Sequence, residues 1–308
     1  MERAHEITPF IKAEALRLGF NRCGVAAAGP VDEATGSYLR SWLDAGHAGT
    51  MAYLAHHFEK RCNPALLVEG TQSIVSVALG YYPAKRLSPV QYQFAYYAYG
   101  RDYHEVVKEK LNVILQELKD RWQVNGRAFC DAVPLLERYW AARAGVGWIG
   151  KNRQMIVPGA GSYFLLGELL LDVKLDYDTP IQNLCGDCTR CLQACPTKAL
   201  TPQGMEASHC LSYLTIEHKG EIPPQAIRVM GHSVYGCDRC QQACPYNQDA
   251  QPTREPSFAP SAAFLSMQPR DWQGLTPVQF NDLFHESAVM RCRYDGLMRN
   301  IRAVDHEP

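Results

Sequence analysis

The sequence lacks both a long apolar run and an excess of charge of one sign. Its longest apolar stretches, residues 74–82 and 163–173, are shorter than the roughly 18 residues that a membrane-spanning helix needs. The chain has 31 Lys and Arg against 32 Asp and Glu, which excludes a uniformly basic protein that coats nucleic acid or anionic lipid. Its first ten residues carry charges where a signal peptide has an apolar core, so we expect a cytoplasmic protein with reduced thiols and no membrane partner.

The length and composition indicate a folded protein of about two domains. The chain has 308 residues, of which 46% are hydrophobic and 20% charged, as in ordinary globular proteins. Residues 1–178 alternate helical and strand patterns and predict an α/β domain. Residues 179–250 are rich in cysteine and proline and predict a second, smaller domain, and residues 251–308 predict a short helical tail. The predicted fold class is therefore α+β.

Hydrophobic periodicity predicts the individual elements of the first domain. The clearest helix is 102–122, where apolar residues recur at helical spacing. Other predicted helices cover 8–19, 31–45, 47–55 and 134–144. Strands are predicted at 23–26, 73–81, 127–131, 154–157 and 163–173, so we expect a sheet of four or five strands.

Eight of the twelve cysteines fall within residues 185–244. The first four follow the spacing C-x2-C-x2-C-x3-C-P, by which bacterial ferredoxins hold 4Fe-4S clusters: Cys185, Cys188, Cys191 and Cys195. Zinc is the alternative, because CxxC pairs also bind zinc, although zinc motifs rarely contain this whole run. The four cysteines outside the segment are expected to be buried side chains: Cys23, Cys62, Cys130 and Cys292.

A second motif, C-x2-C-x3-C-P, repeats the end of the first one at Cys237, Cys240 and Cys244. It lacks one leading cysteine, and Cys210 is the remaining cysteine of the segment that can replace it. Ligation is usually crossed in two-cluster domains, where the last cysteine of each motif binds the other cluster. We therefore expect one 4Fe-4S cluster on Cys185, Cys188, Cys191 and Cys244, and a second on Cys195, Cys210, Cys237 and Cys240.

The glycine-rich segment GVGWIGKN at 145–152 matches two nucleotide-binding patterns in letters only. Both the dinucleotide fingerprint and the P-loop need a strand before the glycines and a helix after them. Here a helical pattern precedes them and a strand pattern follows, and Asn152 replaces the hydroxyl residue that a P-loop uses for magnesium. A turn that lets the backbone approach a large flat cofactor remains open.

Asp131 stands at the end of an apolar strand, shortly before Pro134. Its residue type and place allow two interpretations. It could be a helix N-cap, since aspartate is favoured there. It could also be an acid positioned for catalysis.

Several segments together resemble the epoxyqueuosine reductase family. They are RCNP at 61–64, GRDYH at 100–104, the run from Asp131 to Glu168, and CLSYLTIEHKG at 210–220. The resemblance covers about residues 5–300. It implies an enzyme that uses cobalamin and two 4Fe-4S clusters to reduce epoxyqueuosine to queuosine at the wobble position of tRNA. It also implies that the α/β domain binds base-off cobalamin against a ferredoxin-like domain, and that a low-potential donor such as ferredoxin or flavodoxin supplies electrons.

The resemblance assigns residues to these roles. Asp131 aligns with the proton donor of the family, with Tyr99, His104 and Lys151 as the alternative acids. The residues implied to line cobalamin are Arg61, Tyr99, Asp131, Lys151, Asn152, Ser162, Ser212 and Tyr213.

Two features depart from the family pattern. Ala132 replaces a hydroxyl residue that often follows the acid, and longer members continue into a helical-repeat domain that helps to grip tRNA, so the resemblance is to a short form. We therefore expect Lys219, Arg299 and Arg302 to contact tRNA.

Two other functions are compatible with the cysteine motifs. One is a related cobalamin and iron-sulfur reductase of a small molecule, similar to the reductive dehalogenases, although the N-terminus has no twin-arginine export signal. The other is a non-catalytic ferredoxin-like electron carrier, which has no use for an α/β domain with an acid at a strand end.

Overall fold

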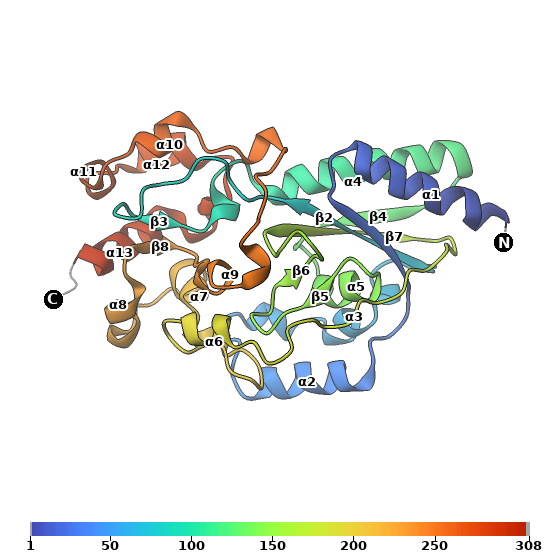
Figure 1. Ribbon diagram of the computed structural model, residues 1–308, viewed down its shortest axis with the longest axis horizontal. Helices are drawn as coiled ribbons and strands as arrows, with labels where there is room; N and C mark the ends of the chain where they lie inside the picture. The colour runs from blue at the N-terminus through green and yellow to red at the C-terminus, as the bar shows by residue number, and fades with distance from the viewer. Residues whose placement is uncertain (1, 306–308) are drawn as a thin grey trace.

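The computed structural model describes residues 2–305. Its main sheet has four antiparallel strands in the order β1-β2-β7-β4 (Figure 1), namely β1 (Arg22–Ala27), β2 (Ser73–Gly80), β7 (Phe164–Leu171) and β4 (Gly126–Phe129). The two central strands, β2 and β7, are buried along almost their whole length. The chain thus combines an antiparallel sheet with many helices, which confirms the mixed character of the predicted fold class.

One face of the sheet is covered by α1 (Glu2–Arg17) and α4 (Tyr103–Trp122). Helix α4 begins after its N-cap Asp102, as predicted, and it packs closely on β7 because Gly167 has no Cβ there. The prediction that Pro9 opens the first helix was wrong. Helix α1 begins at Glu2 and contains Pro9 near its middle, where proline removes one hydrogen bond of the helix.

The opposite face is covered by α5 (Glu137–Arg143), which packs Trp140 and Ala141 on β2 and β7. Helix α2 (Glu33–Asp44) follows β1 as predicted, and α3 (Phe58–Cys62) precedes β2.

The helix predicted at 47–55 was wrong. The segment forms turns and the short 3-10 helix Ala52–Leu54, because Gly46 and Gly49 adopt positive φ angles that interrupt an α-helix. The strand predicted at 154–157 lies outside the main sheet, since β6 (Met155–Ile156) pairs with β5 (Trp148–Ile149) in a separate hairpin.

The cysteine-rich segment consists of short elements: α6 (Arg190–Ala194), α7 (Leu211–Ile216), α8 (Pro224–Met230), β8 (Ser233–Tyr235) and α9 (Arg239–Gln242). Strand β8 pairs in parallel with β3 (Gln93–Phe94), so part of the first segment joins the second. Short 3-10 helices lie at Ala52–Leu54, Pro64–Leu66, Tyr96–Ala98, Ala207–His209, Pro245–Asn247, Pro256–Phe258 and Ala288–Cys292.

The tail is helical, as predicted, and contains α10 (Ala262–Ser266), α11 (Pro269–Gln273), α12 (Pro277–Phe284) and α13 (Arg293–Asp305). Its aromatic side chains Phe264, Trp272 and Phe284 pack around Phe94. Helix α13 contacts α7, α8 and β8. The tail thus belongs to the same core as the first segment, and the three-domain division remains a prediction.

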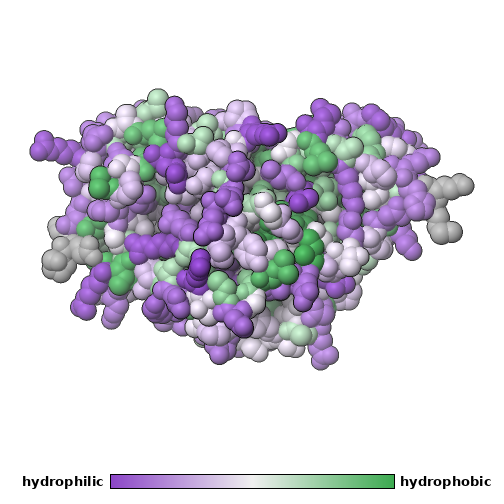
Figure 2. All heavy atoms as spheres, viewed as in Figure 1, coloured by the Kyte–Doolittle hydropathy of each residue, from purple (hydrophilic) through white to green (hydrophobic). Residues whose placement is uncertain are grey.

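One face of the molecule is drawn in Figure 2 by hydropathy. Figure 2 shows hydrophilic residues over most of the visible face, with apolar residues in small groups. Exposed large apolar side chains come from distant parts of the chain, such as Leu16, Leu66 and Val278. Within residues 2–305, no helix is both long and apolar enough to cross a membrane.

Candidate active site and cluster-binding segment

Asp131 follows the end of β4 on a loop and is not a helix cap. Helix α5 begins six residues later, with Leu136 at the N-cap position and no side-chain cap. The N-cap interpretation of Asp131 was therefore wrong. The residue adopts a φ of 50°, in the left-handed region that residues with a Cβ rarely occupy and that aspartate tolerates better than most. Its side chain is 64% exposed, so it can reach a bound molecule.

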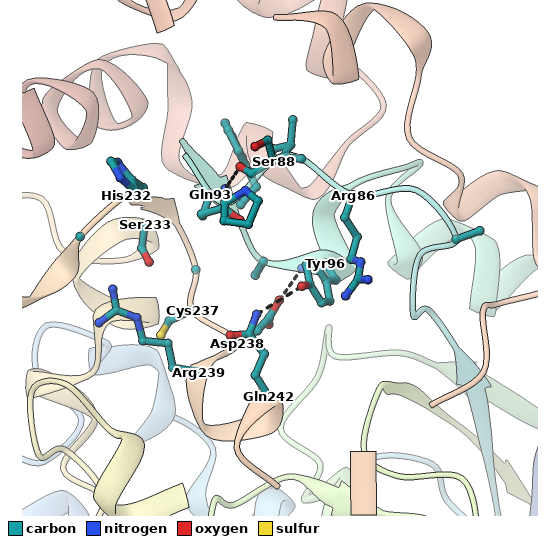
Figure 3. A pocket seen from close by; sticks show the side chains of 17 residues that line it. Arg86, Ser88, Gln93, Tyr96, His232, Ser233, Cys237, Asp238, Arg239 and Gln242 are labelled. Carbon is teal, nitrogen blue, oxygen red and sulfur yellow. Dashed lines mark hydrogen bonds between the residues drawn. The ribbon is translucent and has the colours of Figure 1, made fainter. Parts of the chain in front are cut away.

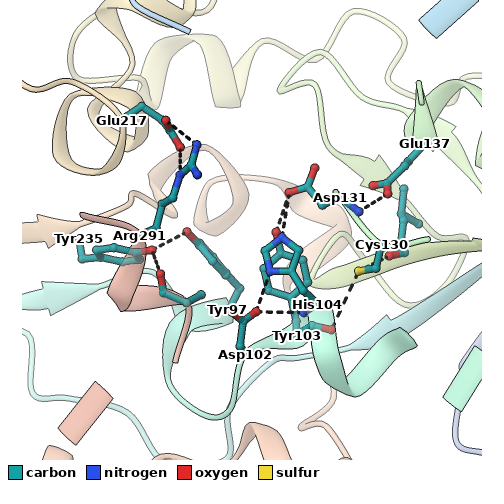
Figure 4. A network of polar contacts seen from close by, with 12 residues as sticks. Tyr97, Asp102, Tyr103, His104, Cys130, Asp131, Glu137, Glu217, Tyr235 and Arg291 are labelled. Atoms are coloured by element: carbon teal, nitrogen blue, oxygen red, sulfur yellow. Dashed lines mark hydrogen bonds and ion pairs between the residues drawn. The ribbon is translucent and has the colours of Figure 1, made fainter. Parts of the chain in front are cut away.

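The first turn of α4 supplies the side chains that contact Asp131 (Figure 4). The Tyr103 hydroxyl donates a hydrogen bond to Asp131 Oδ2 at 2.6 Å. His104 Nε2 lies 3.9 Å from the same oxygen, while its Nδ1 pairs with Asp102 Oδ1 at 2.7 Å. The backbone therefore holds an exposed carboxyl beside a buried phenol and a half-buried imidazole.

The surroundings of Tyr103 and His104 favour the protonated form of both side chains. Burial raises the pKa of Tyr103, and the charge of Asp131 and their hydrogen bond raise it further, so the phenol stays protonated. Burial alone would lower the pKa of His104. The hydrogen bond and charge of Asp102, together with the charge of Asp131, outweigh burial and raise the pKa of the imidazole.

An ion pair lies across from Asp131 in Figure 4. Arg291 donates two hydrogen bonds to Glu217, from Nε at 2.7 Å and from Nη2 at 3.0 Å. The ring of Tyr53 lies against Arg291, and the charges of Glu217, Arg291 and Asp131 all act on its hydroxyl. Tyr53 therefore connects the ion pair to the Asp131 side.

Sequence reasoning missed most of this arrangement. Tyr103 lies inside the GRDYH motif, which was a signal, but its role could not be assigned from the motif alone. The Glu217–Arg291 pair joins residues 74 positions apart, and no local pattern indicates such a contact.

The cysteine thiols gather in two groups. In the first group, burial raises the pKa of Cys191, and the nearby thiols of Cys244, Cys185 and Cys188 raise it further. The pKa of Cys244 is raised by burial and by Cys185 and Cys188. All four thiols line one small cavity.

The second group contains the other four cysteines. Burial raises the pKa of Cys240 above its ordinary value, and so do the thiols of Cys237, Cys210 and Cys195. The thiol of Cys195 acts in the same way on Cys210. This grouping is compatible with crossed ligation, and the ligand sets themselves stay a prediction.

Residues expected at cobalamin fall into two kinds. Arg61 and Asn152 are buried, and within the described part of the chain Arg61 Nε and Asn152 Nδ2 have no hydrogen-bond partner. Asn152 and Lys151 line the cavity of the first thiol group, and Lys151 Nζ donates to the Gly186 carbonyl.

The others already have partners within the chain. The Tyr213 hydroxyl accepts a hydrogen bond from Thr50 N at 2.8 Å, and Ser162 Oγ accepts one from Asn247 Nδ2 at 2.9 Å. Tyr99 is buried and packs its ring on Phe264. Ser212 lies at the start of α7, beside Tyr213.

A cavity of about 730 Å³ opens beside the second thiol group (Figure 3). Cys237, Asp238 and Arg239 line one side, and Arg86 and Tyr96 line the other. The Asp238 carboxylate accepts a hydrogen bond from Tyr96 N at 2.8 Å, which joins the two sides.

The three basic residues expected at tRNA differ in availability. Lys219 and Arg302 are exposed. Arg299 is half-buried, and its guanidinium donates to the carbonyls of Leu214, His218 and Gly220 and to the Asn300 side chain. These bonds use all of its N–H groups, so Arg299 fits a structural role in holding α13 on the cysteine segment.

Comparison with known proteins agrees with these observations. The model of a 4Fe-4S double cluster binding domain matches residues 184–247, and the model of epoxyqueuosine reductase QueG (DUF1730) matches residues 61–132. The first match decides between iron-sulfur clusters and zinc.

The curated relatives that match along the whole length of this chain are epoxyqueuosine reductases. The epoxyqueuosine reductase of Leadbetterella byssophila is 43% identical over 96% of this chain and 97% of its own length, and that of Cyclobacterium marinum is 42% identical over 100% and 99%. A crystal structure of epoxyqueuosine reductase with an epoxyqueuosine-modified tRNA-Tyr stem loop superimposes with a TM-score of 0.91 at 27% identity, covering 99% of this chain and 82% of that chain. The chain therefore belongs to the epoxyqueuosine reductase family of oxidoreductases.

Proposed function

We propose that this chain reduces epoxyqueuosine to queuosine at the wobble position of tRNA, in the cytoplasm. The observation that carries the proposal is the acidic group of Asp131, Tyr103 and His104, in a chain that also gathers eight thiols in two sets. A non-catalytic electron carrier needs the thiols but not the acid. The full-length relatives favour the tRNA substrate over a small organohalide.

The reaction balances as the conversion of an epoxide, two electrons and two protons into an alkene and water. Iron-sulfur clusters deliver electrons one at a time. Cobalamin would supply a cobalt centre that can hold two electrons at low valence for the reduction of the epoxide. The chain must then bind the substrate, position the cofactor and deliver a proton to the oxygen that leaves.

The residues present fit a large polar cofactor. The unpartnered N–H groups of Arg61 and Asn152 are ready to donate to acceptors such as the amide oxygens of cobalamin. Asn152 and Lys151 would contact the cofactor beside the first thiol group. Ser212 and Tyr213 would contact it beside Cys210. The cavity next to Cys237 offers room for a further part of the cofactor. Residues of both the α/β segment and the ferredoxin-like segment would thus hold cobalamin, and an external donor such as ferredoxin or flavodoxin would reduce the clusters.

Asp131 is the proposed proton donor. Its side chain is exposed beside Tyr103 and His104, which hold their own protons and can return one to the carboxylate after transfer. One solved structure of the Bacillus subtilis enzyme, with a TM-score of 0.90 at 28% identity, has its catalytic aspartate loop swung out of the active site. A loop that carries an acid in this family thus occupies more than one position.

Turnover on modified tRNA tests the proposal directly. Anaerobically purified protein with cobalamin and a low-potential reductant is expected to convert epoxyqueuosine in tRNA to queuosine, as read by nucleoside mass spectrometry. The control omits cobalamin and is expected to give no product. Reduction of an organohalide with no queuosine formed would instead favour the small-molecule reductase.

We expect tRNA binding to weaken with salt, but with a shallow slope. A chain with nearly equal numbers of acidic and basic residues neutralises few phosphates, and each phosphate contributes roughly −0.7 to −0.9 to the slope of log K against log salt. Lys219→Glu with Arg302→Glu is expected to weaken binding and flatten the slope, as measured by filter binding across salt concentrations.

Lys119→Glu is the control for this measurement, because Lys119 is exposed on α4, away from α13. If the double variant binds tRNA as tightly as the wild type, the surface formed by Lys219 and Arg302 is not the tRNA-binding surface.

A further inference from the structure

Glu168 is a completely buried acid in the middle of the main sheet. It lies on β7, opposite Ser76 on β2 and Phe129 on β4, and it has no exposed surface. Among residues 2–305, neither of its carboxyl oxygens has a hydrogen-bond donor. An ionised carboxylate in such a place is very costly, so the fold favours the neutral acid.

Helix α5 packs on β7, and the charge of its first residue, Glu137, acts on the buried Glu168 carboxyl. Two carboxyl groups can form a hydrogen bond only when one of them carries a proton. Burial raises the pKa of Glu168, and the charge of Glu137 raises it further. Burial and the charge of Asp131 raise the pKa of Glu137. A neutral Glu168 can therefore offer its proton to a carboxyl oxygen of Glu137.

Glu137 also contacts the loop of the proposed acid. The backbone N–H of Asp131 donates a hydrogen bond to Glu137 Oε1 (Figure 4). Among the described residues, no other side chain accepts a hydrogen bond from a backbone N–H of the loop 131–136. Because Asp131 adopts an unfavourable positive φ, the loop needs such a contact to keep this conformation.

Other groups that face the pair come from three elements. The charge of Glu137 raises the pKa of His104 on α4 and the pKa of the Cys130 thiol after β4. Arg138 on α5 lowers the pKa of Glu137 slightly, but its Nη1 donates to the Arg153 carbonyl. The acids Asp131, Glu137 and Glu168 thus outnumber the cations around them.

We propose that Glu137 and Glu168 form a positioning pair for Asp131. Protonated Glu168 donates to the Glu137 carboxylate, and Glu137 in turn holds the Asp131 N–H, so that the Asp131 carboxyl stays beside Tyr103 and His104. The inference rests on the proposed function for its kinetic consequence. The positioning itself is independent of the substrate.

Glu168→Leu and Glu168→Gln separate positioning from packing. Replacing a buried acid by leucine in an apolar layer is expected to be neutral or stabilising if Glu168 serves packing alone. If Glu168 positions the loop, Glu168→Leu lowers kcat roughly 10- to 100-fold with KM little changed, the usual effect of misplacing a catalytic group. Glu168→Gln restores most of kcat, because its amide still donates to Glu137.

Hydrogen exchange provides a readout without turnover. In the resting holoenzyme, Glu137→Ala is expected to speed exchange at the Asp131 amide by roughly 5-fold or more, since the variant removes the acceptor of that N–H. Glu137→Gln keeps an acceptor oxygen and is expected to stay close to wild type. Glu33→Ala is the matched control, because Glu33 is also a first-turn glutamate but is exposed.

The pH dependence of stability has a definite sign. Because the pKa values of Glu137 and Glu168 are raised in the folded protein, their contribution to stability is present at low pH and is lost as the pH rises through those raised values. Wild-type holoenzyme should therefore lose more thermal stability than Glu168→Gln when the pH is raised.

The results distinguish the two proposals. Wild-type protein that exchanges and titrates as expected but does not reduce epoxyqueuosine would overturn the proposed function and leave the positioning pair standing. Glu168→Leu with wild-type kcat and wild-type exchange at Asp131 would overturn the positioning pair. If Glu137→Ala does not fold, the two Glu168 variants decide the question alone.

Discussion

Asp131→Asn is expected to lower kcat for epoxyqueuosine reduction by roughly 100-fold or more, the usual scale for removing a positioned proton donor. Asparagine keeps the shape of the side chain and an oxygen that can accept from the Tyr103 hydroxyl, which now lies 2.6 Å from Asp131 Oδ2. It has no acidic proton to give to the leaving oxygen. Iron and cobalamin content should stay at wild-type levels, because the substitution adds no bulk and Asp131 is exposed.

The measurement is single-turnover formation of queuosine under anaerobic conditions, with metal analysis of the same preparation. Asp282→Asn is the control, because Asp282 is an exposed aspartate on α12, away from the site. Near-normal turnover by Asp131→Asn would remove the acid assignment. His104 would then be the next candidate, since it lies in the same group, whereas Lys151 bonds to Gly186 and Tyr99 packs in the core.

The fold was predictable where the signal is local. The 102–122 helix has a capping aspartate and a regular apolar face, and both are properties of adjacent residues. The 47–55 segment also contains residues that favour a helix, yet it folds as turns and a short 3-10 helix. Its conformation depends on Tyr213, whose hydroxyl binds Thr50 N across more than 160 residues, and on two glycines with positive φ. Tertiary contacts of this kind override local propensity.

The site was predictable where spacing encodes chemistry. The cysteine motifs gave both thiol sets, because a cluster requires its ligands at fixed short intervals. Asp131 was proposed as the acid through its motif neighbours, and that role stays a prediction. Its anchors were not found, because Glu137 and Glu168 look like a helix start and a strand interior in the sequence. Their contact exists only once α5 packs on β7, so the proposed hydrogen bond between them is a property of the fold.

Arg299 illustrates the opposite error. A basic residue near the end of a neutral chain favours an RNA contact, yet its donors are used by the Leu214, His218 and Gly220 carbonyls. A guanidinium offers five donors, which suit a group of backbone carbonyls as well as a phosphate. Sequence alone does not distinguish these partners.

Cluster ligation gives the other large effect that we expect. Wild-type protein reconstituted anaerobically should contain about eight irons per chain, from two four-iron clusters. Cys195→Ala and Cys210→Ala should each leave about four irons and remove the same electron paramagnetic resonance signal. Cys185→Ala and Cys244→Ala should remove the other signal. Each variant should lose nearly all turnover if both clusters lie on the electron path.

The crossed pairs make this prediction specific. Cys195 belongs to the first sequence motif and Cys244 to the second, yet the neighbouring thiols group Cys195 with Cys240 and Cys244 with Cys185. If each cluster used one motif alone, Cys244→Ala would remove the same signal as Cys240→Ala, and the proposed ligand sets would be wrong. Cys23→Ala is the control, since Cys23 lies on β1 outside both thiol groups, and it should retain about eight irons.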